Sequence, residues 1–194
     1  MAGFVIEDFG APAAFGVVAA LIKTGVVGLI DSRATDLSTD ETLRLLTREI
    51  HRLKATRVVI DSLSGFELAL APTFREDFRE SLFRMVSALA EAGVSVLMTS
   101  ELEDRYTDLR FSPYGTAFLT DAIIVQRYIE VDSRLRRVMA VVKVRSSDHS
   151  DELREYSIGA DGIHVGQTLP GQEGLLGGRP TTRRGKKVAG NAGS

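Results

Sequence analysis

Residues 57–65 read Arg-Val-Val-Ile-Asp-Ser-Leu-Ser-Gly, an apolar run that ends in a carboxylate and a hydroxyl. A short, continuously apolar run of this kind indicates a strand buried in a parallel sheet. Asp61 falls at the carboxyl end of that strand, where open α/β sheets bind their ligands. The stretch therefore predicts an α/β fold and places Asp61, with Ser62 beside it, at a candidate site.

Two more apolar runs, residues 26–31 and 94–99, predict further buried strands before and after this one. An amphipathic helix is expected between the first two strands, because apolar residues recur there at spacings of three and four. Ser38 and Glu41 form the Ser-x-x-Glu capping box that opens such a helix. Its apolar positions are Leu43, Leu46, Ile50 and Leu53.

A second amphipathic helix is expected after Pro72. Thr73 and Glu76 repeat the capping-box pattern, and Gly93 stands where a left-handed C-cap would end the helix. The core face comprises Phe74, Phe78, Leu82, Met85, Val86 and Leu89. The alternation of strands and helices favours a parallel sheet flanked by helices.

The pattern changes in the C-terminal half of the chain. Residues 121–131 and 135–145 are strand-like runs joined by only Asp132, Ser133 and Arg134, which predicts an antiparallel hairpin. Residues 152–158 and 162–165 predict two shorter strands joined by a turn at 159–161. The expected architecture is a parallel α/β core with a C-terminal antiparallel β extension.

Composition excludes several classes of protein. The 194 residues carry a formal net charge of −2 and no cysteine, so disulfides, thiol catalysis and thiolate metal sites are excluded. The absence of cysteine accords with a cytoplasmic protein. No apolar run approaches the roughly 18 residues needed to cross a bilayer, so we expect no membrane partner.

The charge is unevenly distributed along the chain. Residues 178–194 contain five cations and no acid, which leaves a net charge of −7 on the remaining residues. An acidic body argues against nucleic acid as its partner. We predict a folded domain over residues 1–166 and a basic, flexible tail over residues 167–194.

Asp61 has two interpretations at this stage. One carboxylate delivered by an apolar strand is the Walker-B arrangement, in which the acid holds Mg²⁺ beside nucleotide phosphates. An aspartate at a strand end is also a common cap or turn residue. A P-loop requires Gly-x-x-x-x-Gly-Lys-Ser/Thr, and the only Gly-Lys pair of the sequence, Gly185-Lys186, lies in the tail. By itself, the chain is therefore expected to bind ATP poorly or not at all.

Lys143 and Arg145 form a second candidate site. They are two residues apart on a predicted strand, so both side chains project from one face. The polar residues 146–150, which include His149, follow directly. Two cations beside hydroxyls and an imidazole could clamp a phosphate. The alternative is a solvated strand end with ordinary surface charges.

Taken together, these motifs resemble the KaiC family of RecA-like ATPases over roughly residues 15–166. The matching pieces are Ala34–Ser38, Arg57–Gly65, Thr99–Glu101, Ser112–Gly115, Leu119–Ile123 and Lys143–Ser150. The resemblance implies a RecA-like P-loop NTPase core that binds ATP and Mg²⁺ at subunit interfaces of a hexameric homo-oligomer acting in signalling. It makes Asp61 the Walker-B acid that holds Mg²⁺ at the subunit's own nucleotide, with Ser62 beside it as a nucleotide-binding residue. It makes Lys143, Arg145 and His149 the group that reaches the neighbouring subunit's nucleotide.

The sequence also departs from the family pattern. The family's P-loop is expected before this sequence, together with the first strand and helix of the core. Residues 4–8 are a candidate remnant of the strand that carries the family's catalytic carboxylates, with Glu7 and Asp8 as the pair. Ala117 and Phe118 occupy the positions of the clock protein's phosphorylated Ser and Thr, so autophosphorylation there is not expected.

Three functional hypotheses follow from these observations. The first is the C-terminal part of an ATPase domain of the KaiC type. The second is a non-catalytic module that keeps the fold as a scaffold or as the regulatory partner of a signalling protein. The third, a Rossmann-like dinucleotide enzyme, carries little weight because the sequence contains no Gly-x-Gly-x-x-Gly.

Overall fold

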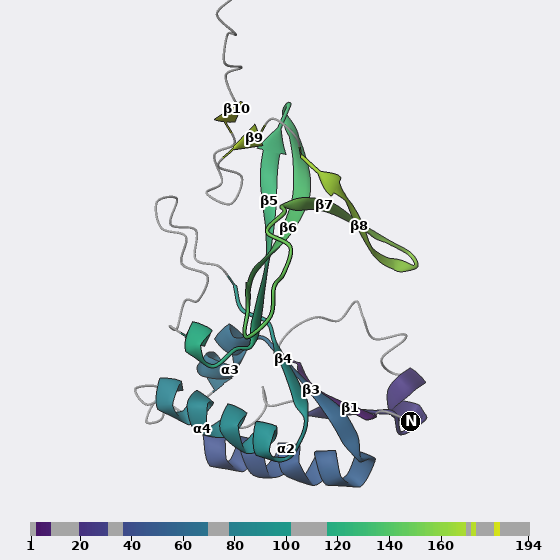
Figure 1. Cartoon of the computed structure of the whole chain (residues 1–194). Helices are drawn as coiled ribbons and strands as arrows, with labels where there is room; N and C mark the ends of the chain where they lie inside the picture. The colour runs from purple at the N-terminus through teal and green to yellow at the C-terminus, as the bar shows by residue number, and fades with distance from the viewer. Residues whose placement is uncertain are drawn as a thin grey trace, which may run out of the picture. The chain divides into compact units, whose positions relative to one another are not determined.

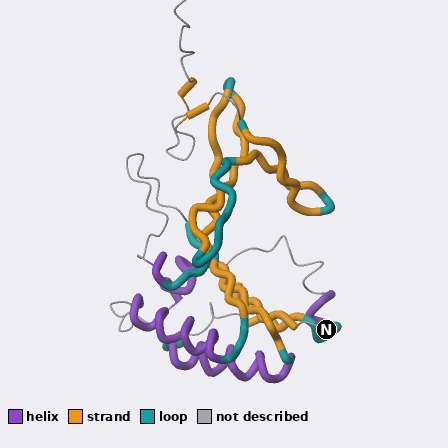
Figure 2. Tube along the Cα trace, in the orientation of Figure 1, coloured by secondary structure: helices purple, strands orange, loops and turns teal. Residues whose placement is uncertain are grey.

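The computed structural model describes residues 3–8, 20–30, 37–69, 78–101, 116–169, 172–173 and 181–182. The chain divides into two compact units. The first unit is formed by residues 1–103 and 112–119, and the second by residues 104–111 and 120–194. Helices belong to the first unit, whereas the described part of the second unit is built from strands and loops (Figures 1 and 2).

A parallel sheet forms the centre of the first unit. Its strands are β1 (Gly3–Asp8), β2 (Val27–Ile30), β3 (Ala55–Asp61) and β4 (Ser95–Met98). They lie in the order β2-β1-β3-β4, and every neighbouring pair is parallel. The predicted α/β class and all three predicted strands are confirmed. Asp31, the predicted end of the second strand, lies outside the described residues.

Helix α2 (Thr39–Leu53) begins where the capping box predicted it. The Ser38 hydroxyl accepts the Glu41 N–H, and the Glu41 carboxylate accepts the Ser38 N–H at 2.8 Å. The Ser38 N–H and the Ser38 hydroxyl both donate to the Glu41 carboxylate, and these two hydrogen bonds hold the pKa of Glu41 below its usual value. The helix ends at Lys54, whose left-handed backbone (φ 50°) closes the last turn.

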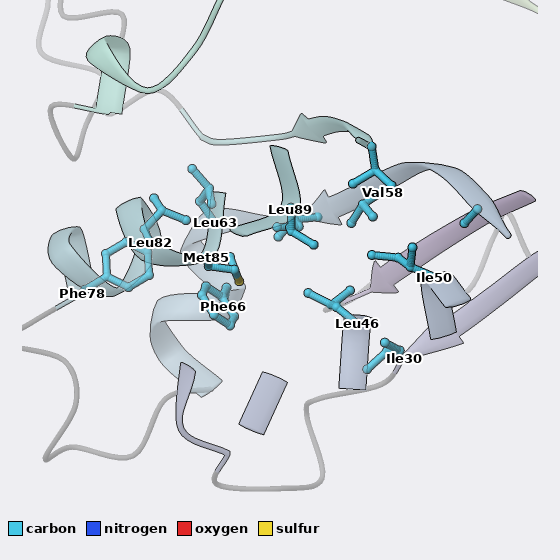
Figure 3. Close-up of a cluster of buried hydrophobic side chains, with 13 residues drawn as sticks. Ile30, Leu46, Ile50, Val58, Leu63, Phe66, Phe78, Leu82, Met85 and Leu89 are labelled. Atoms are coloured by element: carbon cyan, nitrogen blue, oxygen red, sulfur yellow. The ribbon is translucent and has the colours of Figure 1, made fainter. Parts of the chain in front are cut away.

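Helices α3 (Leu63–Ala69) and α4 (Phe78–Glu91) complete the core of the first unit. Figure 3 shows Phe66 of α3 and Met85 of α4 pointing toward one another; each is at most 1% exposed. Gly93 follows α4 with φ +75°, the left-handed conformation expected of a C-cap glycine. The capping box predicted at residues 73–76, and Phe74, lie outside the described residues.

The prediction that residues 94–99 form a buried strand was wrong in one respect. The strand β4 is present, but it lies at the edge of the parallel sheet and Leu97 is 61% exposed. Val96 and Met98, which alternate with Leu97, pack against the main core. Successive side chains of a strand point to opposite faces of the sheet, so Leu97 lies on the face away from the core that Val96 and Met98 contact.

Two buried hydroxyls at the start of α2 lead to a stability prediction. Thr42 is 1% exposed, and its hydroxyl has no hydrogen-bond partner among the residues that the structure describes. Since an unpaired buried hydroxyl costs free energy, Thr42→Val should raise the free energy of unfolding by about 1 kcal/mol in urea denaturation. Thr47→Val is the matched control, because the Thr47 hydroxyl donates to the Leu43 carbonyl at 2.8 Å and its loss should not stabilise. Equal effects of both substitutions would contradict this account.

The second unit contains an antiparallel sheet in the order β5-β6-β7-β8. Its strands are β5 (Ala122–Val131), β6 (Arg134–Val144), β7 (Arg154–Gly159) and β8 (Gly162–Thr168). Asp132 and Ser133 join β5 to β6 with φ values of 51° and 58°, as in a type I′ turn, which confirms the predicted hairpin. The two shorter predicted strands are also confirmed, as β7 and β8, which pair antiparallel. Ile129, Val131 and Val138 form its small core.

Shorter elements complete the described chain. The 3-10 helix η3 (Thr116–Phe118) belongs to the first unit, where Phe118 stacks on Phe83 with ring centroids 6.3 Å apart. The two-residue strands β9 (Gln172–Glu173) and β10 (Thr181–Thr182) pair within the segment for which the sequence predicts no regular structure. Among the helices of the described residues, none is long and apolar enough to cross a bilayer.

Candidate functional site

The carboxyl edge of the parallel sheet brings two of the predicted acidic positions together. Asp61 is the last residue of β3, and Asp8, the last residue of β1, is its register partner on the adjacent strand. Glu7 pairs in the same register with Ile60. Because neighbouring parallel strands end at the same edge, residues 53 positions apart in the sequence meet there.

Asp61 is held by a residue from the next strand. The hydroxyl of Thr99, just after β4, donates a hydrogen bond to Oδ1 of Asp61. The backbone of Thr99 is fixed as well: its N–H donates to the Ile60 carbonyl at 3.0 Å, and its carbonyl accepts the Leu63 N–H at 2.9 Å. The Asp61 carboxylate is therefore exposed but oriented, which suits a group that must bind a ligand from solvent.

Thr99 is a functional candidate whose partner the sequence did not reveal. The sequence places Thr99 at a strand end, but the hydrogen bond joins it to a carboxylate 38 residues away. The available signal was the hydroxyl itself, immediately after an apolar run. Which carboxylate that hydroxyl contacts depends on β4 pairing with β3.

Ser62 caps the helix that follows Asp61. Its hydroxyl accepts the Gly65 N–H at 3.3 Å, and its carbonyl accepts the Phe66 N–H at 2.9 Å, so it opens α3. The peptide bond between Asp61 and Ser62 is cis. A capping role accounts for a hydroxyl at this position without any ligand, although the hydroxyl proton remains able to donate.

Lys143 and Arg145 lie at the end of β6 in the second unit. Lys143 is in the strand, whereas Arg145 is the first residue of the following turn, which corrects the prediction that both belong to the strand. Pairing passes from Ile123↔Lys143 to Ile124↔Val141, so β6 carries one extra residue, Val142, in a β-bulge. A bulge shifts the alternation of side chains and re-aims those beyond it.

Both cations contact the segment that leads into β5. The Lys143 ammonium donates to the Thr120 carbonyl at 2.7 Å. The Arg145 N–H donates to the Asp121 carbonyl at 2.7 Å, and Nη1 of Arg145 lies 3.4 Å from Oδ1 of Asp121. His149 is exposed, with Nδ1 3.0 Å from the Ser150 carbonyl. Since a carbonyl only accepts, Nδ1 carries the proton of the neutral ring and Nε2 is the nitrogen able to accept.

The candidate residues thus fall into two groups. Asp8, Asp61 and Thr99 belong to the first unit, and Lys143, Arg145 and His149 belong to the second. No group of three metal-ligating side chains occurs within the described residues. A single exposed carboxylate oriented by a hydroxyl fits Mg²⁺, which keeps several waters and takes few protein ligands beside phosphate oxygens.

Comparison with known proteins adds a family match. A family model described as "ATPase: KaiC" matches residues 18–169. The chain is 31% identical over 131 residues to the circadian clock protein KaiC3 of Synechocystis sp., covering 68% of this chain and 25% of that protein. It is 26% identical over 157 residues to the circadian clock oscillator protein KaiC 1 of the same organism, covering 81% and 30% respectively.

A solved structure is also similar. The crystal structure of a KaiC-like protein from the hyperthermophilic archaeon Pyrococcus horikoshii OT3 matches with a TM-score of 0.71 and 26% identity. The match covers 84% of this chain and 75% of that one. This match confirms the predicted RecA-like fold, in which a parallel sheet is followed by an antiparallel one. The chain spans only 25–30% of the length of the curated relatives described above.

Proposed function

The chain belongs to the KaiC family of ATPases, and we propose that it is part of a domain that binds and hydrolyses ATP between the subunits of a ring. The resemblance to the KaiC family implies a hexamer, which supports ring assembly for this protein. The observation that carries the proposal is the position of Asp61. It ends a central parallel strand, beside the end of β1 and under the Thr99 hydroxyl.

In this proposal Asp61 binds the Mg²⁺ that accompanies ATP in its own subunit. The metal would neutralise charge on the phosphate oxygens, and Asp61 would hold it through a water molecule or directly. Thr99 keeps the carboxylate in one orientation by donating to Oδ1. Ser62 contributes the turn that follows Asp61 and a hydroxyl proton that can be donated to a ligand.

Glu7 and Asp8 are proposed as the catalytic pair that accepts the proton of the attacking water. The support is the register of β1, which puts Asp8 beside Asp61 at the carboxyl edge of the sheet. A residue that ends the strand next to β3 lies at the sheet edge beside the metal-binding acid, which is where the proposal requires a base for the attacking water. The register of β1 fixes the backbone positions of Glu7 and Asp8, so the proposal assigns this role to the pair and does not choose between them.

Lys143, Arg145 and His149 are proposed to serve the nucleotide of the neighbouring subunit. A lysine and an arginine supplied in trans neutralise the charge that develops on the transferred phosphoryl group, as an arginine finger does. With Nδ1 engaged by the Ser150 carbonyl, the Nε2 atom of His149 is the ring nitrogen left to contact the nucleotide. Each subunit then carries parts of two sites, so activity requires the ring.

The wider role is proposed to be cytoplasmic signalling, with the ring itself and a signalling protein as partners. The named relatives are clock proteins, which supports a signalling context for this chain. The resemblance implies that Ala117 and Phe118 stand where the clock protein carries its phosphorylated Ser and Thr. Neither side chain has a hydroxyl, so we propose no autophosphorylation there.

A second candidate function is a non-catalytic scaffold or regulatory module of the KaiC type. It is favoured by one observation: the 194 residues contain no Gly-x-x-x-x-Gly-Lys-Ser/Thr, the motif that cradles nucleotide phosphates. The codons upstream of Met1 distinguish the two functions. An in-frame Walker A motif supports the ATPase, and a stop codon directly upstream supports the module.

The proposed function predicts Mg²⁺-dependent nucleotide binding that requires Asp61. Native mass spectrometry with ATP and Mg²⁺ should detect little binding to the 194 residues alone, because they lack the phosphate cradle. A protein extended upstream through an in-frame Walker A motif should bind ATP, and Asp61→Asn should remove the Mg²⁺ dependence. Asp40→Asn, an exposed acid of α2, is the matched control and should change nothing. Absent binding by the extended protein would refute the ATPase.

A further inference from the structure

The Thr120–Asp121 segment contacts both proposed trans-acting cations at the start of β5. The Thr120 carbonyl binds the Lys143 ammonium, and the Asp121 carbonyl binds the Arg145 N–H, each at 2.7 Å. Ala122↔Val144 and Ile123↔Lys143 are the first register pairs of the hairpin. The Arg145–Asp121 backbone hydrogen bond and these register pairs therefore tie the end of β6 to the beginning of β5 independently of any side-chain charge.

The side chain of Asp121 adds a different kind of contact. Its carboxylate lies 3.4 Å from Nη1 of Arg145, and the two side chains are 83% and 53% exposed. Ion pairs this exposed are weak, because water screens them and both side chains lose rotamer freedom. An anion that binds arginine more tightly can therefore displace the Asp121 carboxylate. A polyphosphate is such an anion, because it offers several charged oxygens to one guanidinium.

We propose that Asp121 is a positioning residue that holds the Arg145 guanidinium in an exchangeable ion pair until a polyphosphate displaces the carboxylate. The inference rests on the proposed function, because it takes Arg145 to serve a nucleotide. Asp121 thus competes with the phosphate for one cation, which lowers phosphate affinity but keeps the guanidinium near its working position. The Arg145–Asp121 backbone hydrogen bond and the first register pairs of the hairpin hold the strand ends in both states.

Asp121→Asn separates the charge from the backbone contacts. The substitution keeps the size of the side chain and the carbonyl that accepts the Arg145 N–H, and it removes only the competing negative charge. Without the phosphate cradle the 194-residue chain should still bind inorganic tripolyphosphate weakly at low salt, through Lys143 and Arg145. Titration calorimetry should show that Asp121→Asn tightens this binding about two- to fivefold. In an Arg145→Ala background the same substitution should give a clearly smaller gain.

Glu152→Gln is the matched control for loss of one negative charge. Glu152 forms an exposed ion pair with Arg154 in the same unit, with Nε of Arg154 3.0 Å from its carboxylate. The Glu152→Gln substitution should leave tripolyphosphate affinity within about a factor of 1.5 of wild type, since distant exposed charges are largely screened. Far-ultraviolet circular dichroism should show that all three single variants keep their secondary structure.

Several results would overturn the proposal. The first two are equal tripolyphosphate affinities of wild type and Asp121→Asn, and an equal gain in affinity with Glu152→Gln. The others are a gain in affinity that persists in full in the Arg145→Ala background, and no detectable binding by either wild type or Asp121→Asn. The Asp61-dependent ATP experiment fails or succeeds separately, because it reports on the first unit. A negative tripolyphosphate result with positive ATP binding would remove the role of Asp121 and leave the proposed function standing.

Discussion

Rings assembled from equal amounts of Asp61→Asn and Arg145→Ala subunits should recover about a quarter of wild-type ATP turnover, although each variant alone should lose about 10³-fold. Each proposed site uses Asp61 of one subunit and Arg145 of its neighbour. Random mixing pairs an intact Asp61 with a neighbouring intact Arg145 at about one interface in four. The rings are made from the protein extended upstream through an in-frame Walker A motif, and phosphate release is measured.

The matched control mixes two variants damaged on the same side of the interface. Rings of Lys143→Ala and Arg145→Ala subunits contain no interface with an intact pair of trans cations, so turnover should stay at the level of the single variants. Recovery in this control, or none in the first mixture, would show that Asp61 and Arg145 do not belong to a site shared between subunits. Either result would leave the family assignment untouched.

Phe66→Ala should cause the largest loss of stability in the first unit. Phe66 is 1% exposed and lies with its ring centroid 5.9 Å from that of Phe78, in a tilted arrangement that links α3 to α4. Removing a buried phenyl ring loses its transfer free energy and leaves a cavity, at a total cost of about 3–5 kcal/mol. Urea denaturation of the first unit, followed by far-ultraviolet circular dichroism, measures the loss.

Phe83→Ala provides the corresponding control on the surface. Phe83 is 48% exposed and stacks on Phe118, itself 53% exposed, so the ring buries far less apolar area than Phe66 does. We expect a cost of about 1 kcal/mol or less. If Phe66→Ala cost no more than Phe83→Ala, the core seen in Figure 3 would not be the one that stabilises α3 and α4.

Local signals in the sequence predicted most of the elements. The capping box of Ser38 and Glu41, the three- and four-residue spacing of apolar residues, and the left-handed Gly93 are interactions within one helix or its ends. The turn at Asp132 and Ser133 is equally local, because its φ values match the twist of the two strands that it joins. Such features need no knowledge of the remaining chain.

The predictions that failed involve the position of an element among others. Leu97 is exposed because it points to the face of β4 opposite to Val96 and Met98, and an apolar run does not encode which face of a strand the core covers. Arg145 left the predicted strand because β6 ends at Val144 after the bulge at Val142. A two-residue alternation predicted from sequence assumes an unbroken ladder, and the bulge breaks it.

The sequence by itself determined the α/β class, the two kinds of sheet and the residues that carry charge at strand ends, because periodicity and caps act over a few neighbouring residues. Only the tertiary structure decided that Asp8 pairs with Asp61, that Thr99 donates to Asp61, and that Asp121 meets Arg145. Each of these contacts joins residues more than 20 positions apart. Strand order and register bring them together, and both are set by packing of the whole unit rather than by any local pattern.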